Sequence, residues 1–229
     1  MNINMKKVIY SLAVMFALVG FTSCDYDSKD DAKITYYVSI ELEGDEVLQV
    51  PVGTEFVEPG YKAIENGEDV TSKVVVGGDE VDADQVGIYH VTYSAKNVDG
   101  FSKSVSRTVV VYNPDVTTNI SGTYTVEANT LPRSVNGNPV TLTELAPGLY
   151  SISDWWGGLY DVTIGYGAAY RATGYLQLNE DNTIEGISGS SVWGGETPFE
   201  YATGSYNPAT DKVSLEVDML YQFTMTMGK

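Results

Sequence analysis

Few residues of this chain are of the types that usually carry out catalysis or bind metals. Cys24 is the only cysteine and His90 the only histidine among 229 residues. One cysteine forms neither an intramolecular disulfide nor a cysteine-type zinc site, so the fold must be stable through its core alone. His90 lies in the alternating run "IYHVTYSA", which places it on the solvent face. We therefore assign no catalytic and no metal-binding residue, and expect no cofactor.

Acidic residues are the remaining candidates for chemistry. Two carboxylates at a suitable separation hydrolyse glycosidic bonds. The C-terminal half offers Asp154, Asp161, Glu180, Asp181, Glu185 and Glu196. With 31 acidic residues in the chain such pairs arise by chance, and no local motif selects one. The acids from Asp79 to Asp84 could bind Ca²⁺, but their spacing differs from an EF-hand loop and favours a solvated turn. A net charge of −18 without a basic patch argues against nucleic acid as a partner.

Aromatic side chains give the most suggestive pattern for binding. From residue 120 onward the chain holds nine Tyr, three Trp and two Phe, many in glycine-rich stretches. In "SISDWWGGLYD" the two glycines would turn the chain between strands, and alternation allows one tryptophan to lie in the core while the other is exposed. Exposed rings stack on sugars or pack on a partner, whereas core packing is the alternative. The candidate ligand- or partner-binding residues are Trp155, Trp156, Tyr160, Tyr166, Tyr170 and Trp193.

The N-terminus has the pattern of an exported, lipid-anchored protein. Two lysines precede a mostly apolar run, Val8 to Gly20, that is too short for an ordinary transmembrane helix. The following "FTSC" resembles a bacterial lipobox, with Phe21 in place of the usual Leu. This resemblance implies that residues 1–23 are a signal peptide and that Cys24 is acylated. Acylated Cys24 would hold the protein on outer-membrane lipid.

An acidic tether, residues 24–32, follows the signal peptide. Its residues Ser28, Lys29, Asp30 and Asp31 resemble the export signal that sends lipoproteins of Bacteroides-type bacteria to the outer cell surface. The resemblance implies an outer-membrane location with the domains facing the cell exterior. A plain solvated tether on a periplasm-facing protein is the alternative.

Two β domains must position these residues, which makes the predicted fold class all-β. Residues 33–112 begin with the alternating run "KITYYVSIEL" and contain roughly seven short strands, which predicts an immunoglobulin-like Greek-key sandwich. Residues 113–119, "NPDVTTN", are the predicted linker. Residues 120–229 contain eight strand-like runs, among them "GLYDVTI", joined in part by the hairpin turns "NEDN" and "NPATD". They predict an antiparallel barrel or sandwich, lipocalin-like in outline.

Both halves resemble known families. Glu58-Pro59-Gly60-Tyr61 and Gly87-Ile88-Tyr89 resemble the marks of a bacterial surface Ig-like family over about residues 33–112. The order "SGTYTV", "PGLYSISDWWGGLYD" and "GYLQLNEDNTI" resembles the C-terminal β domain of small surface lipoproteins of gut Bacteroides-type bacteria. Such lipoproteins accompany SusC/SusD-type nutrient importers, so the resemblance implies a non-catalytic accessory protein that binds a glycan or peptide or docks on the transporter. The alternatives are an adhesin or structural spacer, and a glycan hydrolase with a carboxylate pair.

Overall fold

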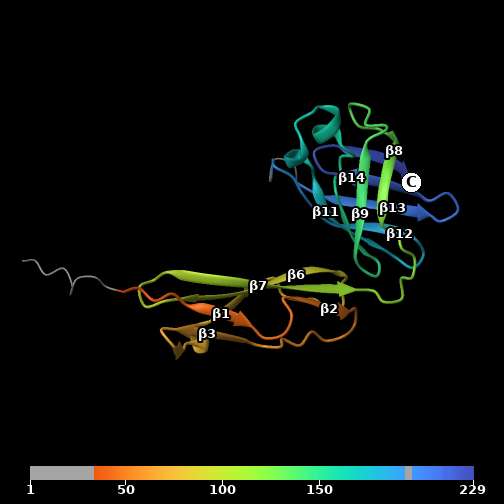
Figure 1. Cartoon of the computed structure of the whole chain (residues 1–229). Helices are drawn as coiled ribbons and strands as arrows, with labels where there is room; N and C mark the ends of the chain where they lie inside the picture. Colours follow the sequence, from red (N-terminus) through yellow and green to blue (C-terminus); the bar gives the residue numbers. More distant parts are fainter. Residues whose placement is uncertain (1–33, 194–197) are drawn as a thin grey trace, which may run out of the picture. The chain divides into compact units, whose positions relative to one another are not determined.

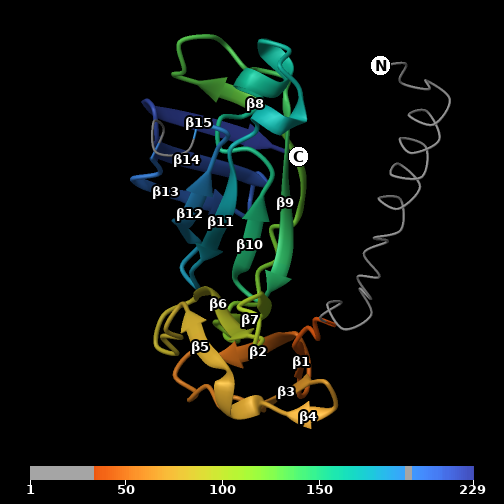
Figure 2. The same ribbon diagram turned by 90° about the vertical axis from the view of Figure 1, so that its left-hand side faces the viewer.

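The computed structural model describes residues 34–193 and 198–229 (Figures 1 and 2). The predicted signal peptide, the lipidation site Cys24 and the export signal Ser28–Asp31 lie outside these residues. Within them the chain is almost entirely β, as predicted. None of the helices formed by the described residues has the length and apolar character needed to cross a membrane.

The N-terminal domain is a sandwich of two sheets, which confirms the predicted Ig-like architecture. One sheet has the order β1-β3-β4, with β1 Ser39–Leu42, β3 Tyr61–Glu65 and β4 Glu68–Asp69. The other has the order β2-β7-β6-β5, with β2 Val47–Pro51, β7 Ser102–Tyr112, β6 Gly87–Lys96 and β5 Val75–Gly78. A 3₁₀ turn, η1 Thr71–Lys73, links β4 to β5. The two sheets bury one core between them, including Val38, Ile40, Ala63, Val91, Tyr93 and Val109.

The first strand is shorter than predicted. It begins at Ser39 rather than Lys33, because its partner β3 ends at Glu65, one residue beyond the partner of Ser39. The buried residues Val38 and Ile40 nevertheless lie on the predicted inner face. Strand β6 follows the prediction closely, with Tyr93 buried and His90 exposed.

An ion pair between buried Arg107 and half-buried Glu58 explains the Glu58-Pro59-Gly60-Tyr61 stretch. Arg107 of β7 is fully buried, and its Nη2 atom lies 3.0 Å from Oε1 of Glu58. The same nitrogen donates to the carbonyl oxygen of Gly60, at 3.0 Å, and the hydroxyl of Tyr93 donates to the other oxygen of Glu58. A buried charge is tolerated only when it is paired and hydrogen-bonded, so Glu58 fastens the β2–β3 connection to the core.

The C-terminal domain is a closed antiparallel barrel of eight strands, as predicted. Each strand pairs with the next in sequence, and β15 pairs with β8 to close the barrel. The strands are β8 Gly122–Asn129, β9 Pro139–Ala146, β10 Leu149–Ile152, β11 Thr173–Leu178, β12 Thr183–Ser190, β13 Tyr201–Asn207, β14 Lys212–Asp218 and β15 Gln222–Gly228. Strand β14 shows the underlying pattern, because Val213, Leu215 and Val217 are buried and alternate with more exposed residues.

Short turns close one end of the barrel. The predicted hairpins "NEDN" and "NPATD" connect β11 to β12 and β13 to β14, with Asn182 and Asp211 at positive φ. At this end the hydroxyl of Tyr124 donates to the carbonyl oxygen of Ile120 at 2.8 Å, and the hydroxyl of Tyr150 donates to that of Thr118 at 3.1 Å. These bonds attach the residues that precede β8 to the base of the barrel.

The prediction of the barrel strands is wrong at two places: one predicted strand is a helical turn, and one observed strand was not predicted. The run "GLYDVTI" forms a single π-helical turn, η2 Leu159–Thr163, instead of a strand. The strand that was not predicted is β12, whose sequence "TIEGISGS" contains two glycines, a residue type that is depleted in strands.

Candidate functional site

The barrel carries its long connections at one end, which we call the open end. Because consecutive strands are antiparallel, alternate connections lie at the same end of the barrel. The connections at the open end are residues 130–138, 153–172, 191–200 and 219–221, whereas the opposite end has only two- to four-residue turns and the two ends of the domain chain. Residues 153–172 contain η2 and a 3₁₀ turn, η3 Ala168–Tyr170. Loops held by a rigid barrel are the usual place for a binding site.

A buried carboxylate holds the base of the 153–172 connection together. Asp154 accepts backbone N–H bonds from Trp156 at 3.1 Å, Gly158 at 2.8 Å and Ala172 at 3.0 Å. Burial raises the pKa of Asp154 above its usual range, and the three hydrogen bonds oppose that shift. The carboxylate therefore joins the two ends of a connection whose middle projects from the barrel.

Two glycines and an asparagine fix the turn that follows. Gly157 and Gly158 both have the positive φ that favours glycine, at 60° and 80°. The side chain of Asn138, from the β8–β9 connection, donates to both of their carbonyl oxygens and to the Thr163 hydroxyl at 2.8 Å. The left-handed turn and this contact from another loop end the strand pattern, which is why Leu159 begins a helical turn.

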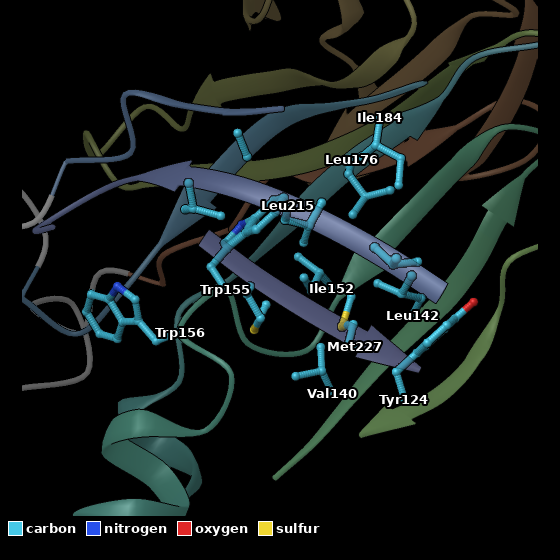
Figure 3. Packing of buried hydrophobic residues seen from close by; sticks show 14 of the residues in the cluster. Tyr124, Val140, Leu142, Ile152, Trp155, Trp156, Leu176, Ile184, Leu215 and Met227 are labelled. Atoms are coloured by element: carbon cyan, nitrogen blue, oxygen red, sulfur yellow. The ribbon is translucent and has the colours of Figure 1, made fainter. Parts of the chain in front are cut away.

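Both tryptophans of "DWWGG" are buried, so the interpretation with one of them exposed is wrong. Each side chain is 0% exposed, because the segment is a turn and the alternation of a strand does not apply. Trp155 donates from its ring nitrogen to the carbonyl oxygen of Ser188 at 3.0 Å and contacts the ring of Phe199. Figure 3 shows Trp155 directed into the barrel core beside Leu215, and Trp156 directed away from it.

Five of the six predicted binding residues form one aromatic cluster at the open end. The ring of Tyr160 lies 4.6 Å from Trp156 and 4.5 Å from Trp193, centroid to centroid. Tyr170 lies 5.6 Å from Trp193 and 5.1 Å from Tyr166. We define the aromatic cluster as Trp156, Tyr160, Tyr166, Tyr170 and Trp193. The sixth predicted residue, Trp155, belongs to the barrel interior instead.

The aromatic cluster is buried at its base and open at its top. Trp156 is fully buried, Tyr160, Tyr170 and Trp193 are partly exposed, and Tyr166 is 57% exposed. Further exposed apolar residues lie in the open-end connections, namely Val162, Val192, Leu220 and Tyr221. A ligand can therefore reach ring faces that a packed layer holds in place.

The aromatic cluster carries phenol hydroxyls and indole N–H groups, and one ion pair lies beside it. Burial, followed by the hydrogen bond with Tyr221, raises the pKa of Tyr160 to about 12, so its hydroxyl keeps its proton at neutral pH. Next to the cluster Arg171 forms an ion pair with Asp161, with Nε 2.5 Å from Oδ2. Tyr221 was not among the predicted site residues. It could have been found from the sequence as an aromatic residue at the tip of the β14–β15 hairpin. Because alternate connections lie at the same end of the barrel, this hairpin tip lies at the open end.

The acidic residues considered for hydrolysis have other roles where the structure describes them. Asp154 binds backbone N–H groups, and Asp161 pairs with Arg171. Asp181 accepts bonds from Thr183 in a hairpin at the opposite end. Glu196 lies outside the described residues. Glu180 accepts from Asn113 and Glu185 from Gln177, so Asp154 and Asp161 at the open end are separated in the chain topology from the hairpin residues Glu180 and Asp181.

The acidic turn of the Ig-like domain also has local bonding roles. Asp79 accepts the backbone N–H of His90 at 2.8 Å, and Asp82 accepts that of Asp84 at 3.0 Å. In residues 34–193 and 198–229 no three His, Cys, Asp or Glu side chains are grouped so as to hold a metal ion.

Comparisons with known proteins match both domains. A family model of the bacterial surface protein Ig-like domain matches residues 40–111, and a family model described as a C-terminal domain matches residues 113–229. The lipoprotein BT2262 from Bacteroides thetaiotaomicron, known from a crystal structure, is 38% identical, with 83% of this chain and 98% of that chain covered and a TM-score of 0.41. The relationship rests on the sequence identity and the family model. No curated protein matches the chain.

Two further matched structures come from ZmpB of Clostridium perfringens and are only distantly similar. The M60 catalytic domain with CBM51-1 and CBM51-2 is 19% identical, with 80% of this chain and 14% of that chain covered and a TM-score of 0.29. CBM51-2 in complex with GlcNAc, with INT domains, is 15% identical, with 83% and 43% covered and a TM-score of 0.28.

The match to BT2262 thus joins the two domains in one relative. A lipoprotein relative and a bacterial surface domain indicate a cell-surface or membrane-associated location. The chain belongs to the family of two-domain Bacteroides surface lipoproteins that includes BT2262, with an Ig-like domain followed by a β-barrel domain.

Proposed function

We propose that the protein is a non-catalytic accessory lipoprotein of a SusC/SusD-type nutrient uptake system that binds a glycan at the open end of its barrel. Acylation of Cys24 holds it on the outer membrane, with its domains facing the cell exterior. The observation that carries the proposal is the aromatic cluster, in which five aromatic residues from two different connections contact one another.

The chemistry of the aromatic cluster fits a carbohydrate. The C–H faces of a sugar ring pack on aromatic faces, and sugar hydroxyls exchange hydrogen bonds with phenol hydroxyls. The exposed ring of Tyr166 provides a stacking face, and partly exposed Tyr170 and Trp193 extend it. Trp156 and Tyr160 beneath them restrict ring motion, which lowers the entropy lost on binding.

A binding screen with matched variants tests the proposal. Full-length protein is run in affinity gels that contain plant, host-mucin or microbial polysaccharides, and a panel of peptides is titrated in parallel. Retardation by a glycan is expected, and Tyr166→Ala should weaken that binding about fivefold, since one stacked ring contributes ~1 kcal/mol. Tyr37→Ala, which removes a tyrosine of similar exposure in the Ig-like domain, should bind as wild type. Binding of peptides alone, or equal binding by both variants, would refute the glycan site.

The transporter context needs a separate measurement. Gentle detergent extraction of the native membrane, followed by affinity purification of the full-length protein, should recover an outer-membrane transporter pair. Recovery of the protein alone, while glycan binding is retained, would leave a surface binding protein outside such a system.

A further inference from the structure

We propose that the Ig-like domain docks on the lipid bilayer through its membrane tip, which we define as the β6–β7 turn, residues 97–101, together with Tyr37. This inference rests on the proposed acyl anchor at Cys24, but it concerns a surface remote in sequence from the aromatic cluster. It assigns the bilayer that carries the anchor as a second binding partner.

The membrane tip exposes large apolar side chains side by side. Val98 is 76% exposed, Tyr37 66% and Phe101 52%. The rings of Tyr37 and Phe101 lie 5.6 Å apart, so they form one surface. Amphipathic and apolar rings of this kind are enriched where a protein meets the interface of a membrane.

The turn is rigid, which favours docking. Asn97 accepts backbone N–H bonds from Asp99 at 3.1 Å and from Phe101 at 2.7 Å. Gly100 has φ 90° and donates to the carbonyl oxygen of Asn97. The N–H of Val98 donates to Glu65 at 2.9 Å, which fixes the turn to β3. A preformed apolar tip loses little conformational entropy when it enters a lipid interface.

The position of the acyl anchor indicates that the partner of the membrane tip is the bilayer. Tyr37 follows Cys24 by thirteen residue positions, so the acyl group lies at most ~45 Å from the membrane tip along an extended chain. Because Tyr37 is itself part of the tip, the anchor raises the local concentration of lipid at this end of the domain. The tip is thereby an exposed apolar surface that lies close to the anchor along the chain.

The charges beside the tip suit lipid phosphates. Lys96 ends β6 and Lys103 lies near the start of β7, and both are exposed in a chain of net charge −18. Their ammonium groups can reach head groups while the aliphatic stems follow the apolar surface. Glu65 is almost fully buried and paired with Lys73 at 3.0 Å, and Oδ2 of Asp99 is also withdrawn from solvent.

A single-thiol experiment tests the docking. Cys24 is the only cysteine and is blocked when acylated, so Val98→Cys provides one free thiol for an environment-sensitive nitrobenzoxadiazole dye. Full-length acylated protein is placed in vesicles of phosphatidylethanolamine with phosphatidylglycerol as the minor lipid. Flotation reports the anchor, and quenching by brominated acyl chains reports dye depth. The matched control is Val57→Cys in the β2–β3 connection, where the side chain is 73% exposed.

The proposal expects the dye at position 98, but not at 57, to shift to shorter wavelengths and to be quenched severalfold by brominated lipid. Replacing Tyr37 and Phe101 by Ser should abolish the difference while flotation persists. Flotation with equal, water-like emission at both positions would overturn the docking and leave the anchor intact. Loss of flotation would overturn both. Shielding at position 98 that requires an added transporter would replace the bilayer by a protein partner and also overturn the docking.

Discussion

Asp154 connects the two ends of the 153–172 connection through backbone hydrogen bonds. It is buried and accepts three backbone N–H bonds from both ends of the 153–172 connection. We predict that Asp154→Asn lowers the free energy of unfolding by about 2–3 kcal/mol, because the amide has one acceptor oxygen and turns a donor toward an N–H group. Urea denaturation followed by tryptophan fluorescence measures this loss.

Asp161→Asn is the matched control for that prediction. It removes one partner of the Asp161–Arg171 ion pair, in which the arginine is 41% and the aspartate 11% exposed, so the loss should be about 1 kcal/mol and smaller than that of Asp154→Asn. Equal losses for the two variants would contradict the assigned role of Asp154.

The raised pKa of Tyr160 predicts how the stability of the protein depends on pH. Its pKa is raised from 10.0 to about 12, first by burial, so the folded state holds the phenol proton more tightly than the unfolded state. The resulting stability is complete below pH 10 and is lost as the pH rises toward 12. Tyr160→Phe should therefore reduce the decline of stability over this range, measured by urea denaturation at several pH values. An unchanged pH profile in the variant would show that Tyr160 titrates as in the unfolded chain.

At the scale of elements, alanine variants of Gly157 and Gly165 distinguish the cost of a strained backbone from the cost of overpacking. Both have positive φ, at 60° and 85°, but a Cβ at Gly157 would lie 2.7 Å from Sδ of Met225, whereas one at Gly165 meets nothing within 4 Å. Alanine costs ~1–2 kcal/mol at either position through the left-handed backbone. Overpacking adds ~1–3 kcal/mol at Gly157. Chemical denaturation of both variants should give the larger loss for Gly157→Ala, and equal losses would contradict the described packing.

Arg107 joins strand β7 to the connection between β2 and β3. Arg107→Met leaves half-buried Glu58 without its cation and removes the donor to the carbonyl oxygens of Glu43 and Gly60, so we predict a loss of about 2–3 kcal/mol in the stability of the Ig-like domain. Lys103→Met in the same strand changes an exposed cation and should cost less than ~1 kcal/mol. A small effect of Arg107→Met in thermal unfolding would show that the ion pair contributes little.

The strands that could be predicted are those whose apolar residues alternate, such as β6 and β14. The missed strand β12 contains Gly186 and Gly189 because the ring of Phe199 packs against both: a Cβ there would lie 2.6 Å or less from that ring. The sequence of η2, "LYDVT", consists of residues that favour strands, so it was predicted as a strand. It forms a helical turn because Asn138, in another connection, binds it through the Thr163 hydroxyl. Such long-range packing leaves no local periodic signal.

At the scale of the whole molecule, the two-domain organisation followed from the change in composition near the predicted linker. The candidate site was predicted as a set of residues but not as a geometry. Trp155 could not be distinguished from Trp156 by sequence, because only the turn after Asp154 directs the first ring into the barrel and the second toward Trp193. In these proposals the N-terminal part, with the anchor and the membrane tip, binds lipid, and the barrel binds the glycan.

The most direct test of the central claim is calorimetric titration with the polysaccharide that retains the wild-type protein. Full-length wild type is compared with the double variant Tyr166→Ala/Tyr170→Ala and with Tyr37→Ala. Two lost stacking rings predict about thirtyfold weaker binding by the double variant at unchanged thermal stability, and wild-type affinity for Tyr37→Ala. Equal affinity of all three proteins would contradict a glycan site at the open end of the barrel.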